Sequence, residues 1–158
     1  MNGKGIIVSR LAEDEEIETL KRITGLKVER LTSRFTSAGN LIAANDTGAI
    51  VADIIGDEGV QTVKATLGVP VTRMRIADHV QIGAMMGVTN RGAIVHPSAS
   101  ESELEVVRKS LRVEPEPATV NGGVPFVGSA FVGNTNGVLL GNITRGGELV
   151  IISRAFTS

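Results

Sequence analysis

The stretch AGNLIAANDTGAIVAD, residues 38–53, decides the fold. It holds two short apolar runs, LIAA and AIVA, on either side of the polar sequence NDTG. Asn, Asp and Gly favour the tight turns of β-hairpins, because they adopt positive φ angles at little cost. The stretch therefore predicts a β-hairpin, with Gly48 in a left-handed turn position that would strain any residue with a Cβ.

Copies of this hairpin recur along the chain. Each copy has one glycine before the first apolar run and another in the turn, and both sets keep spacings of 44 and 45 residues. The glycines are Gly39, Gly83 and Gly128 in the first set and Gly48, Gly92 and Gly137 in the second. The sequence NGKG near the N-terminus repeats the turn 43 residues before Gly48. A shared period of this size indicates a repeat architecture, in which each unit buries its apolar face against its neighbours.

A helix is predicted after each hairpin. Apolar residues at helical spacing predict one helix over 12–24 and another over 57–67, and each is followed by a glycine typical of a helix C-terminus. Ser100 and Glu103 have the spacing of a capping box and predict the start of a third helix. The apolar run at 149–152 is interpreted as helical by analogy, although its β-branched residues would suit a strand equally.

Each unit is thus predicted as strand, turn, strand, helix and strand, in an α+β fold with sheets inside and helices outside. We expect a single domain with units at approximately 1–31, 32–74, 75–120 and 121–158, stacked openly or closed in a ring. The first unit would lack its leading hairpin strand and the last its closing strand. The chain would therefore hold about three and a half units.

Composition excludes several classes of function. Hydrophobic residues make up 42% of the 158 residues, with four Phe and no Trp or Tyr, so the core is expected to be aliphatic. The net charge of −1 disfavours a dedicated nucleic-acid binder. The absence of cysteine excludes disulfides, thiolate metal sites and a cysteine nucleophile. Because no apolar run is long enough to span a bilayer, we expect a cytoplasmic protein.

The remaining motifs predict no catalytic residue, no metal site and no cofactor. His79 and His96 stand apart from any carboxylate pattern, and we interpret both as surface residues rather than metal ligands. The spacings of the glycines match neither of the phosphate-binding glycine patterns. The acidic run at 13–16 is interpreted as favourable electrostatics at the start of a helix.

Three of the hairpin segments resemble the translation initiation factor 6 family of archaea and eukaryotes. They are AGNLIAANDTGAIVAD at 38–53, IGAMMGVTNRGAIVHP at 82–97 and VGSAFVGNTNGVLLG at 127–141, and RFTSAGN at 34–40 is similar too. The resemblance keeps its register over nearly the whole chain. It implies a pentein-type β/α propeller of about five such units, of which about three and a half are present here.

The resemblance also implies a function. Members of that family bind the large ribosomal subunit on the surface that meets the small subunit, and so prevent subunit association sterically, without catalysis. They also act in the biogenesis of the large subunit. The expected partners are ribosomal proteins near the sarcin–ricin loop, with limited rRNA contact and no membrane.

Compared with that family, the chain lacks the first unit and half of the second, so a closed ring is not expected from this sequence alone. Either the sequence is a truncation or two chains complete one another, and both interpretations stay open here. The exposed edges of the incomplete sheets would favour self-association.

The resemblance assigns ribosome binding to polar residues of the hairpins and of the segment before them. Transferred residue by residue, these are Asn40, Asn45 and Asp46, then Arg30 and Arg34, and then Asn90 and Asn134 in the equivalent turns. Each has a structural alternative. Asn and Asp stabilise turns through their own backbone, an asparagine at a strand start can cap neighbouring backbone groups, and arginines commonly lie on solvated faces.

Two other functions are alternatives to ribosome binding. Pentein proteins also include enzymes that modify guanidine groups with a cysteine nucleophile, and this chain has no cysteine to supply the thiolate. The other rival is a non-catalytic repeat fragment that keeps the fold but does not bind ribosomes.

Overall fold

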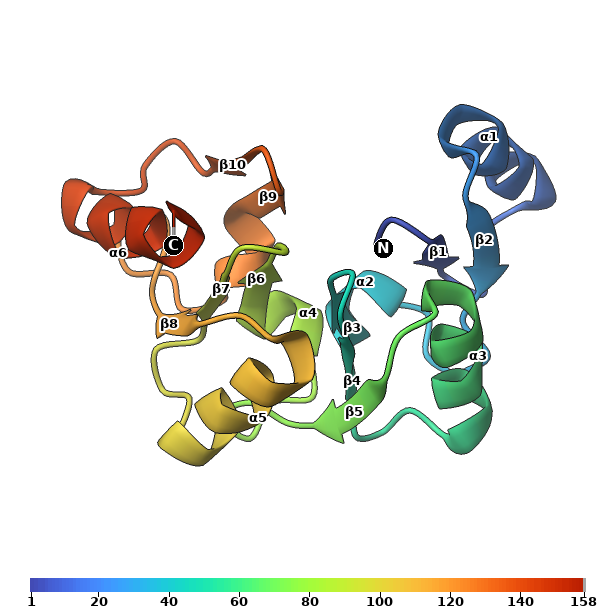
Figure 1. Cartoon of the computed structure of the whole chain (residues 1–158), viewed down its shortest axis with the longest axis horizontal. Coiled ribbons are helices and arrows are strands. Elements are labelled where there is room, and N and C mark those ends of the chain that lie inside the picture. Colours follow the sequence, from blue (N-terminus) through green and yellow to red (C-terminus); the bar gives the residue numbers. More distant parts are fainter. Residues whose placement is uncertain (158) are drawn as a thin grey trace.

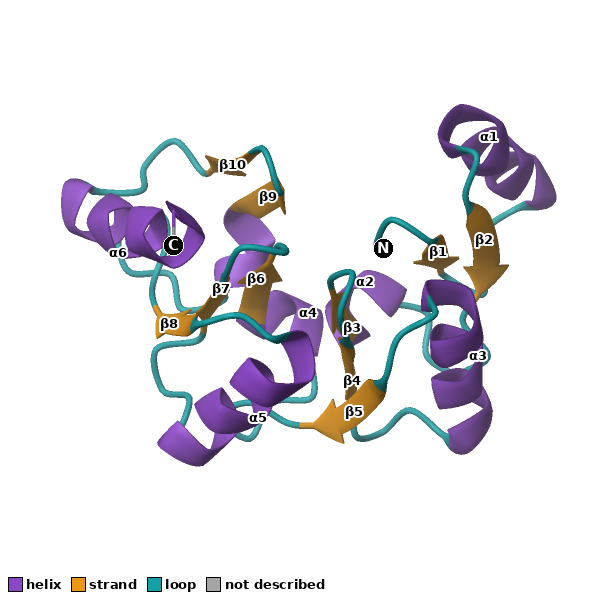
Figure 2. Cartoon of the chain, in the orientation of Figure 1, coloured by secondary structure: helices purple, strands orange, loops and turns teal. Residues whose placement is uncertain are grey.

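The computed structural model describes residues 1–157, which form a mixed α and β fold (Figure 1). The chain curves as an arc, with small β-sheets on its inner side and the longer helices along its outer side (Figure 2). No helix among the described residues is long and apolar enough to cross a bilayer.

Ten short strands and six α-helices follow one another along the described residues. The strands are β1 (Gly5–Val8), β2 (Lys27–Arg30), β3 (Ile42–Ala44), β4 (Ala49–Ala52), β5 (Val71–Met74), β6 (Met86–Val88), β7 (Ala93–Val95), β8 (Pro115–Pro117), β9 (Phe131–Asn134) and β10 (Gly137–Leu140). The longer helices are α1 (Asp14–Thr24), α3 (Asp57–Leu67), α5 (Glu101–Leu111) and α6 (Gly146–Thr157). The short ones are α2 (Ala38–Leu41), α4 (Ile82–Met85) and the 3-10 helix η1 (Val127–Ala130).

The two central sheets have the same topology. In the sheet β3-β4-β5, β3 pairs with β4 antiparallel and β5 pairs with β4 parallel, and the sheet β6-β7-β8 repeats this order and pairing. The parallel partners need a crossover connection, which α3 and α5 provide. The two outer sheets are smaller within the described residues. The first contains the parallel pair β1-β2, and the last contains the antiparallel hairpin β9-β10.

Local sequence accounts for the ends of the longer helices. Gly25 and Gly68 end α1 and α3 in the left-handed conformation, with φ of 68° and 61°, which glycine adopts without a Cβ clash. At the start of α5, the Ser100 hydroxyl accepts a hydrogen bond from the Glu103 N–H, and the Glu103 carboxylate accepts one from the Ser100 N–H. The predicted capping box is therefore confirmed. The run at 149–152 is helical and belongs to α6.

Short helical turns, which the sequence pattern does not predict, precede the hairpins. α2, α4 and η1 occupy residues that the sequence analysis assigns to the start of the first hairpin strands or to the segments just before them. Four residues are too few to show helical periodicity, so an apolar run of this length is ambiguous between strand and helix. The short helices α2 and α4 stack closely. A Cβ at Gly83 in α4 would lie well inside contact distance of the Gly39 carbonyl oxygen in α2, so the stacking requires glycine at residue 83. α1 also begins at Asp14, two residues later than predicted.

The predicted reason for Gly48 is wrong. Its φ is not positive, since the positive-φ glycines among the described residues are at other positions. The neighbouring helix requires the glycine instead, because a Cβ at Gly48 would collide with the carbonyl oxygen of Ser110 near the end of α5. Gly92 is placed in the same way against the carbonyl oxygen of Ala155 in α6. Gly48 and Gly92 therefore allow the hairpins β3-β4 and β6-β7 to lie directly against the helix of the next segment.

The core is aliphatic, as the composition predicts, and it forms three clusters among the described residues. The largest lies between the central sheets and the helices α3 and α5. The second joins β7 and η1 to α6. The third has Ile6, Ile17 and Val28 as its buried members, from β1, α1 and β2. The N-terminal segment thus has its own small core at one end of the arc.

Candidate functional site

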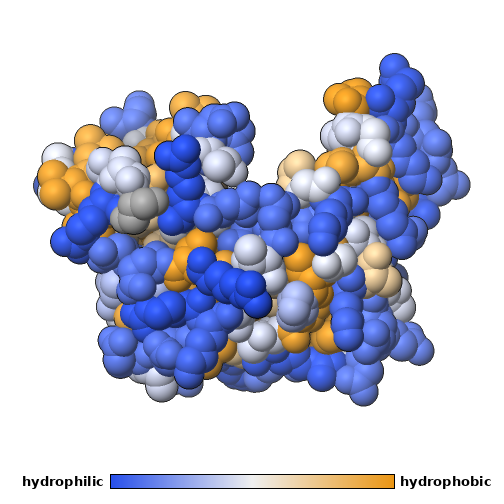
Figure 3. Space-filling view, in the orientation of Figure 1, coloured by the Kyte–Doolittle hydropathy of each residue, from blue (hydrophilic) through white to orange (hydrophobic). Residues whose placement is uncertain are grey.

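The hairpin turns from four segments of the chain line one hollow of about 440 Å³. Its polar lining comprises Asn2, Asn45, Asp46, Thr89, Asn90, Asn134 and Thr135. A notch separates the two ends of the arc in the space-filling view (Figure 3). The structure thus brings together four of the residues to which the sequence analysis assigns ribosome binding, and they come from three different hairpins.

Asn45 joins its own turn to the next hairpin and helix. Its side chain is 4% exposed. The Oδ1 atom accepts hydrogen bonds from the Thr47 and Gly48 N–H groups, at 3.0 and 3.1 Å. The Nδ2 atom donates to the carbonyl oxygens of Thr89 at 3.2 Å and Leu111 at 2.9 Å. Asn45 is therefore a structural residue that holds the turn in place, and its side chain is not available for direct contact with a partner.

Asn2 has the same role one segment earlier. Its Oδ1 atom accepts from the Lys4 and Gly5 N–H groups, and its Nδ2 atom donates to the carbonyl oxygens of Asn45 and Leu67. The sequence predicts this turn, but it carries no signal for the bonds that the turn makes to the next segment.

Asn134 repeats the turn geometry, but its side chain makes no hydrogen bond to another segment among the described residues. Its Oδ1 atom accepts from the Asn136 and Gly137 N–H groups, at 2.8 and 3.2 Å, as the Oδ1 atom of Asn45 does in its own turn. The side chain is exposed, and its Nδ2 atom has no hydrogen-bond acceptor among the described residues. This amide therefore presents its donors to solvent at the C-terminal end of the arc.

Asp46 and Asn90 form an exposed pair that links two adjacent turns. The Asp46 N–H donates to Asn90 Oδ1 at 2.9 Å, and Asn90 Nδ2 donates to Asp46 Oδ2 at 2.5 Å. The Gly3 N–H donates to Asp46 Oδ1 at 2.7 Å. That bond, and after it the bond from Asn90, holds the pKa of Asp46 below its ordinary value. At neutral pH this carboxylate is therefore a charged and well-positioned acceptor on the turn surface.

Asn40 and Arg34 lie at the other end of the hairpin. Asn40 is in α2, which precedes β3, whereas the turn follows β3. Its side chain is exposed and has no hydrogen-bond partner among the described residues. The Arg34 guanidinium lies 4.9 Å from the ring centroid of Phe35, where a cation–π contact orients it. These two residues are therefore exposed and lie before β3, separate from the turns.

Arg30 has a structural partner within its own segment. Its guanidinium donates to the Ala12 carbonyl oxygen at 2.9 Å and to the Asp14 carboxylate at 2.6 Å. Arg73 makes the equivalent pair of bonds, to the Ile55 carbonyl oxygen and the Asp57 carboxylate. Arg30 thus ties β2 to the start of α1, away from the turns.

Two histidines and a phenylalanine form an aromatic cluster near α4. The ring centroids of His79, His96 and Phe126 lie 5.8 to 5.9 Å apart. His96 is 7% exposed, so its predicted position at the surface is wrong. Burial, and after it the charge of His79, lowers the pKa of His96. Among the described residues, no group of three or more His, Cys, Asp or Glu side chains is placed to hold a metal ion.

The model of the eIF-6 family matches residues 1–155. The chain belongs to the eIF-6 family. Relatives in this family include translation initiation factor 6 of Thermococcus onnurineus, which is 37% identical over 98% of this chain and 70% of its own length. The factor of Haloquadratum walsbyi is 38% identical over 96% of this chain and 67% of its own length. The factor of Cenarchaeum symbiosum is 38% identical over 99% of this chain and 71% of its own length. The family resemblance seen in the hairpin motifs is therefore confirmed.

Proposed function

We propose that this member of the eIF-6 family binds the large ribosomal subunit and sterically prevents its association with the small subunit. The observation that carries the proposal is the set of hairpin turns around one hollow, with Asp46 and Asn90 exposed and held by mutual hydrogen bonds. Preorganised polar groups of this kind lose little entropy on binding. Such a surface suits a protein partner, and the mechanism needs no bond to be made or broken.

The fold that we propose is a pentein-type β/α propeller. The repeated topology of the two central sheets supports it, as do the hydrogen bonds that Asn2 and Asn45 make, each to the next segment of the chain. In such an arrangement each unit is related to the next by one rotation, so equivalent turns gather at one end of the rotation axis. The units at 1–31, 32–74, 75–120 and 121–158 would be successive blades, the first and last incomplete.

The site residues then divide by role. Asp46, Asn90 and Asn134 contact the ribosomal proteins near the sarcin–ricin loop, and Asn45 positions their turns from within. Asn40 and Arg34 make a second contact from the other end of the hairpin. Arg30 supports β2 through its bond to Asp14. Contact with rRNA is limited, because the net charge of −1 gives little attraction to phosphates. A role in biogenesis of the large subunit, within the cytoplasm, is part of the same proposal.

Sucrose-gradient sedimentation with archaeal large ribosomal subunits tests the proposal. We expect the chain to co-migrate with the large subunit and to reduce joining of the small subunit. The double substitution Asn40→Ala and Asp46→Ala should abolish co-migration. Each single substitution then shows how much its end of the hairpin contributes to binding of the large subunit. Asn142→Ala is the matched control, because Asn142 is an exposed asparagine in the loop after β10.

The substituted chains are first compared by circular dichroism, since Asp46 also bonds Gly3 and Asn90. Loss of binding in a folded Asn40→Ala chain, with binding retained by Asn142→Ala, supports the assigned site. If the unsubstituted chain fails to co-migrate at any salt concentration, the proposal is wrong and the chain is a repeat fragment without ribosome binding.

A further inference from the structure

The sequence contains three Asn-Gly pairs, at residues 2–3, 121–122 and 136–137. In such a pair the backbone nitrogen of the glycine can attack the side-chain amide carbon of the asparagine, because the two atoms close a five-membered ring. Glycine leaves this approach unobstructed, since it has no Cβ and moves freely in φ and ψ. Whether a pair reacts therefore depends on what holds the asparagine amide and the glycine N–H in the folded chain.

The pair at Asn2 and Gly3 is held at both groups. Asn2 is 8% exposed, and its amide makes the four hydrogen bonds described above. The Gly3 N–H donates to the Asp46 carboxylate at 2.7 Å. Loss of that proton would leave a negative nitrogen facing a negative carboxylate, which is electrostatically unfavourable. The fold thus protects Asn2 from attack.

The pair at Asn121 and Gly122 is protected in the same two ways. Asn121 is half-buried, and its Oδ1 atom accepts a hydrogen bond from the Thr144 hydroxyl at 3.4 Å. The amide lies against the backbone of Gly141, where a Cβ would overlap it. The Gly122 N–H donates to the Glu148 carboxylate at 3.0 Å, so a negative group again opposes loss of the proton.

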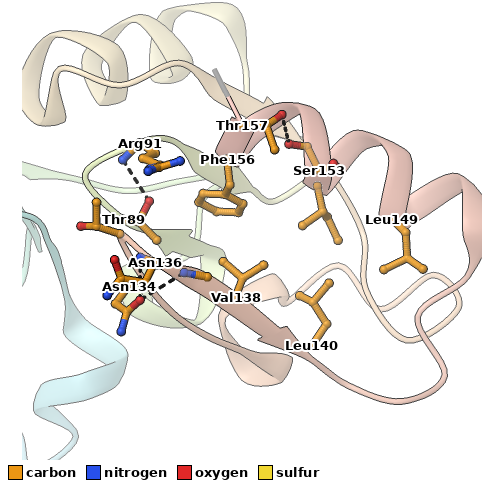
Figure 4. A pocket seen from close by; sticks show the side chains of 13 residues that line it. Thr89, Arg91, Asn134, Asn136, Val138, Leu140, Leu149, Ser153, Phe156 and Thr157 are labelled. Atoms are coloured by element: carbon orange, nitrogen blue, oxygen red, sulfur yellow. Dashed lines mark hydrogen bonds between the residues drawn. The ribbon is translucent and has the colours of Figure 1, made fainter.

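The pair at Asn136 and Gly137 has neither protection. It lies at the turn that joins β9 to β10, beside a pocket of about 350 Å³ that Asn134 and Asn136 help to line (Figure 4). Asn136 is exposed, and its side chain has no hydrogen-bond partner in the part of the chain that the structure describes. The Gly137 N–H donates to the Oδ1 atom of Asn134, a neutral acceptor, at 3.2 Å. The amide of Asn136 is therefore free to turn toward the Gly137 nitrogen.

The exposure of Asn136 follows from its place in the turn. Lys4, Thr47 and Arg91 hold the same place in the other turns, directly before the turn glycine, and all three are exposed. Thr47 and Arg91 are exposed although β5 and β8 complete their sheets. This place is therefore open to solvent in the three-stranded sheets as well as at β10.

We propose that Asn136 is a site of spontaneous self-modification, at which the folded chain converts asparagine to aspartate and isoaspartate. The Gly137 nitrogen gives up its proton to water or hydroxide and bonds to Cγ of Asn136. The bond from Cγ to Nδ2 breaks, the side-chain nitrogen leaves as ammonia, and a succinimide ring remains. One water molecule then opens the ring at either carbonyl carbon. Each conversion thus consumes one water and releases one ammonia.

Either product changes the turn that presents Asn134. Both products carry a carboxylate in place of a neutral amide, so the turn gains a negative charge. Isoaspartate also adds a methylene to the main chain between residues 136 and 137, which displaces the Gly137 N–H relative to the Oδ1 atom of Asn134. The modified chain therefore differs in charge and in turn geometry at this one hairpin. This inference does not depend on the proposed ribosomal function.

Incubation of the folded chain in mildly alkaline buffer, followed by mass spectrometry of its peptides, tests the proposal. We expect conversion at Asn136 to be at least about tenfold faster than at Asn2 or Asn121, because those amides must first break their hydrogen bonds. Aspartate and isoaspartate peptides should both form at Asn136, since only the ring gives isoaspartate. Equal rates at the three asparagines, or aspartate as the only product, would overturn the proposal.

The unfolded chain is the control for the role of the structure. In concentrated urea the three pairs lose the contacts that distinguish them, so their rates of conversion should agree within about threefold. If Asn136 kept its full lead in urea, local sequence rather than the fold would set the rate, and the structural argument for the site would be overturned.

A pair of glycine substitutions tests the attacking group. Gly137→Ala places a methyl group beside the nitrogen, and conversion at Asn136 should slow at least about tenfold. The fold tolerates this Cβ, because Gly137 has open space around it and its φ is not positive. Gly39→Ala is the matched control, because Gly39 has equally open space but follows an alanine, so the rate should stay unchanged. An undiminished rate in Gly137→Ala would overturn the proposal.

Discussion

Asn45 and Asn134 provide a matched pair for measuring what the bonds between segments contribute to stability. Both side chains accept two N–H groups of their own turn through Oδ1. Only Asn45 also donates through Nδ2 to a neighbouring hairpin and helix, at the carbonyl oxygens of Thr89 and Leu111. Substituting each by alanine removes the equivalent pair of bonds to turn N–H groups. Asn45→Ala also removes a bond from the Thr47 hydroxyl, so the difference in stability reports that bond together with the two bonds to the neighbouring segment.

The expected magnitudes follow from burial. Asn45→Ala removes four hydrogen bonds to backbone groups and one from the Thr47 hydroxyl, at a residue that is 4% exposed, and water cannot replace them in the packed structure. At about 1 kcal/mol for each bond, the free energy of unfolding should fall by about 3–5 kcal/mol. Asn134 is exposed, so water replaces its two turn bonds and Asn134→Ala should cost about 0.5–1 kcal/mol.

Urea unfolding followed by circular dichroism measures the difference, because the chain has no Trp or Tyr for intrinsic fluorescence. With a slope of about 2 kcal/mol per molar urea, the midpoint for Asn45→Ala should lie about 1–2 M below that for Asn134→Ala. Equal midpoints would refute the reasoning, because they would mean that the Nδ2 bonds between segments contribute no stability. Asn2→Ala should resemble Asn45→Ala, since it loses the equivalent pair of bonds.

Two further outcomes are expected. Gly92→Ala should lower the free energy of unfolding, measured in urea, by about 3 kcal/mol or more, because the added Cβ would collide with the Ala155 carbonyl oxygen. Gly137 has open space around it, so Gly137→Ala should change the free energy of unfolding by less than about 1 kcal/mol. The N–H of Arg145, more than any other group, lowers the pKa of Glu148 to about 2 from its ordinary 4.5. The ionised Glu148 carboxylate therefore stabilises the fold above about pH 4.5, and this contribution is lost as the pH falls toward 2. In acid, the free energy of unfolding should therefore fall less steeply with decreasing pH for Glu148→Gln than for the unsubstituted chain.

Much of the fold could be predicted from the sequence because the hairpin turns and helix ends carry local signals. Gly25 and Gly68 end their helices as predicted, and the Ser100 capping box is present. Apolar spacing gave α3 with its observed bounds. These features depend on residues close together in sequence, and single-sequence patterns detect that kind of interaction.

Features that depend on neighbouring segments could not be predicted in the same way. Gly48 looked like a turn residue, but the carbonyl oxygen of Ser110, 62 residues later, explains it. β8 is a strand although it reads Pro-Glu-Pro, because its partner β7 and the core impose the extended conformation that proline also favours.

The candidate site shows the same limit. Asn45, Asp46, Asn90 and Asn134 form one class of turn residue in the sequence, yet the structure buries Asn45 and exposes the other three. The difference arises from position in the arc. Asn45 faces a following hairpin and helix, whereas no such segment covers Asn134 among the described residues. A spacing pattern identifies equivalent positions but not which of them has a neighbour.

The small separate cluster of Ile6, Ile17 and Val28 has a consequence for motion. Ile17 of α1 packs in this small cluster, whereas β1 and β2 also pack against α3. Helix α1 can therefore open while the packing around α3 and α5 stays in place. Repeat proteins stabilised mainly by adjacent segments unfold from their ends. Native-state hydrogen exchange should therefore be fastest in α1, slower in α3 and slowest in β4 and β7, where the backbone is paired on both sides.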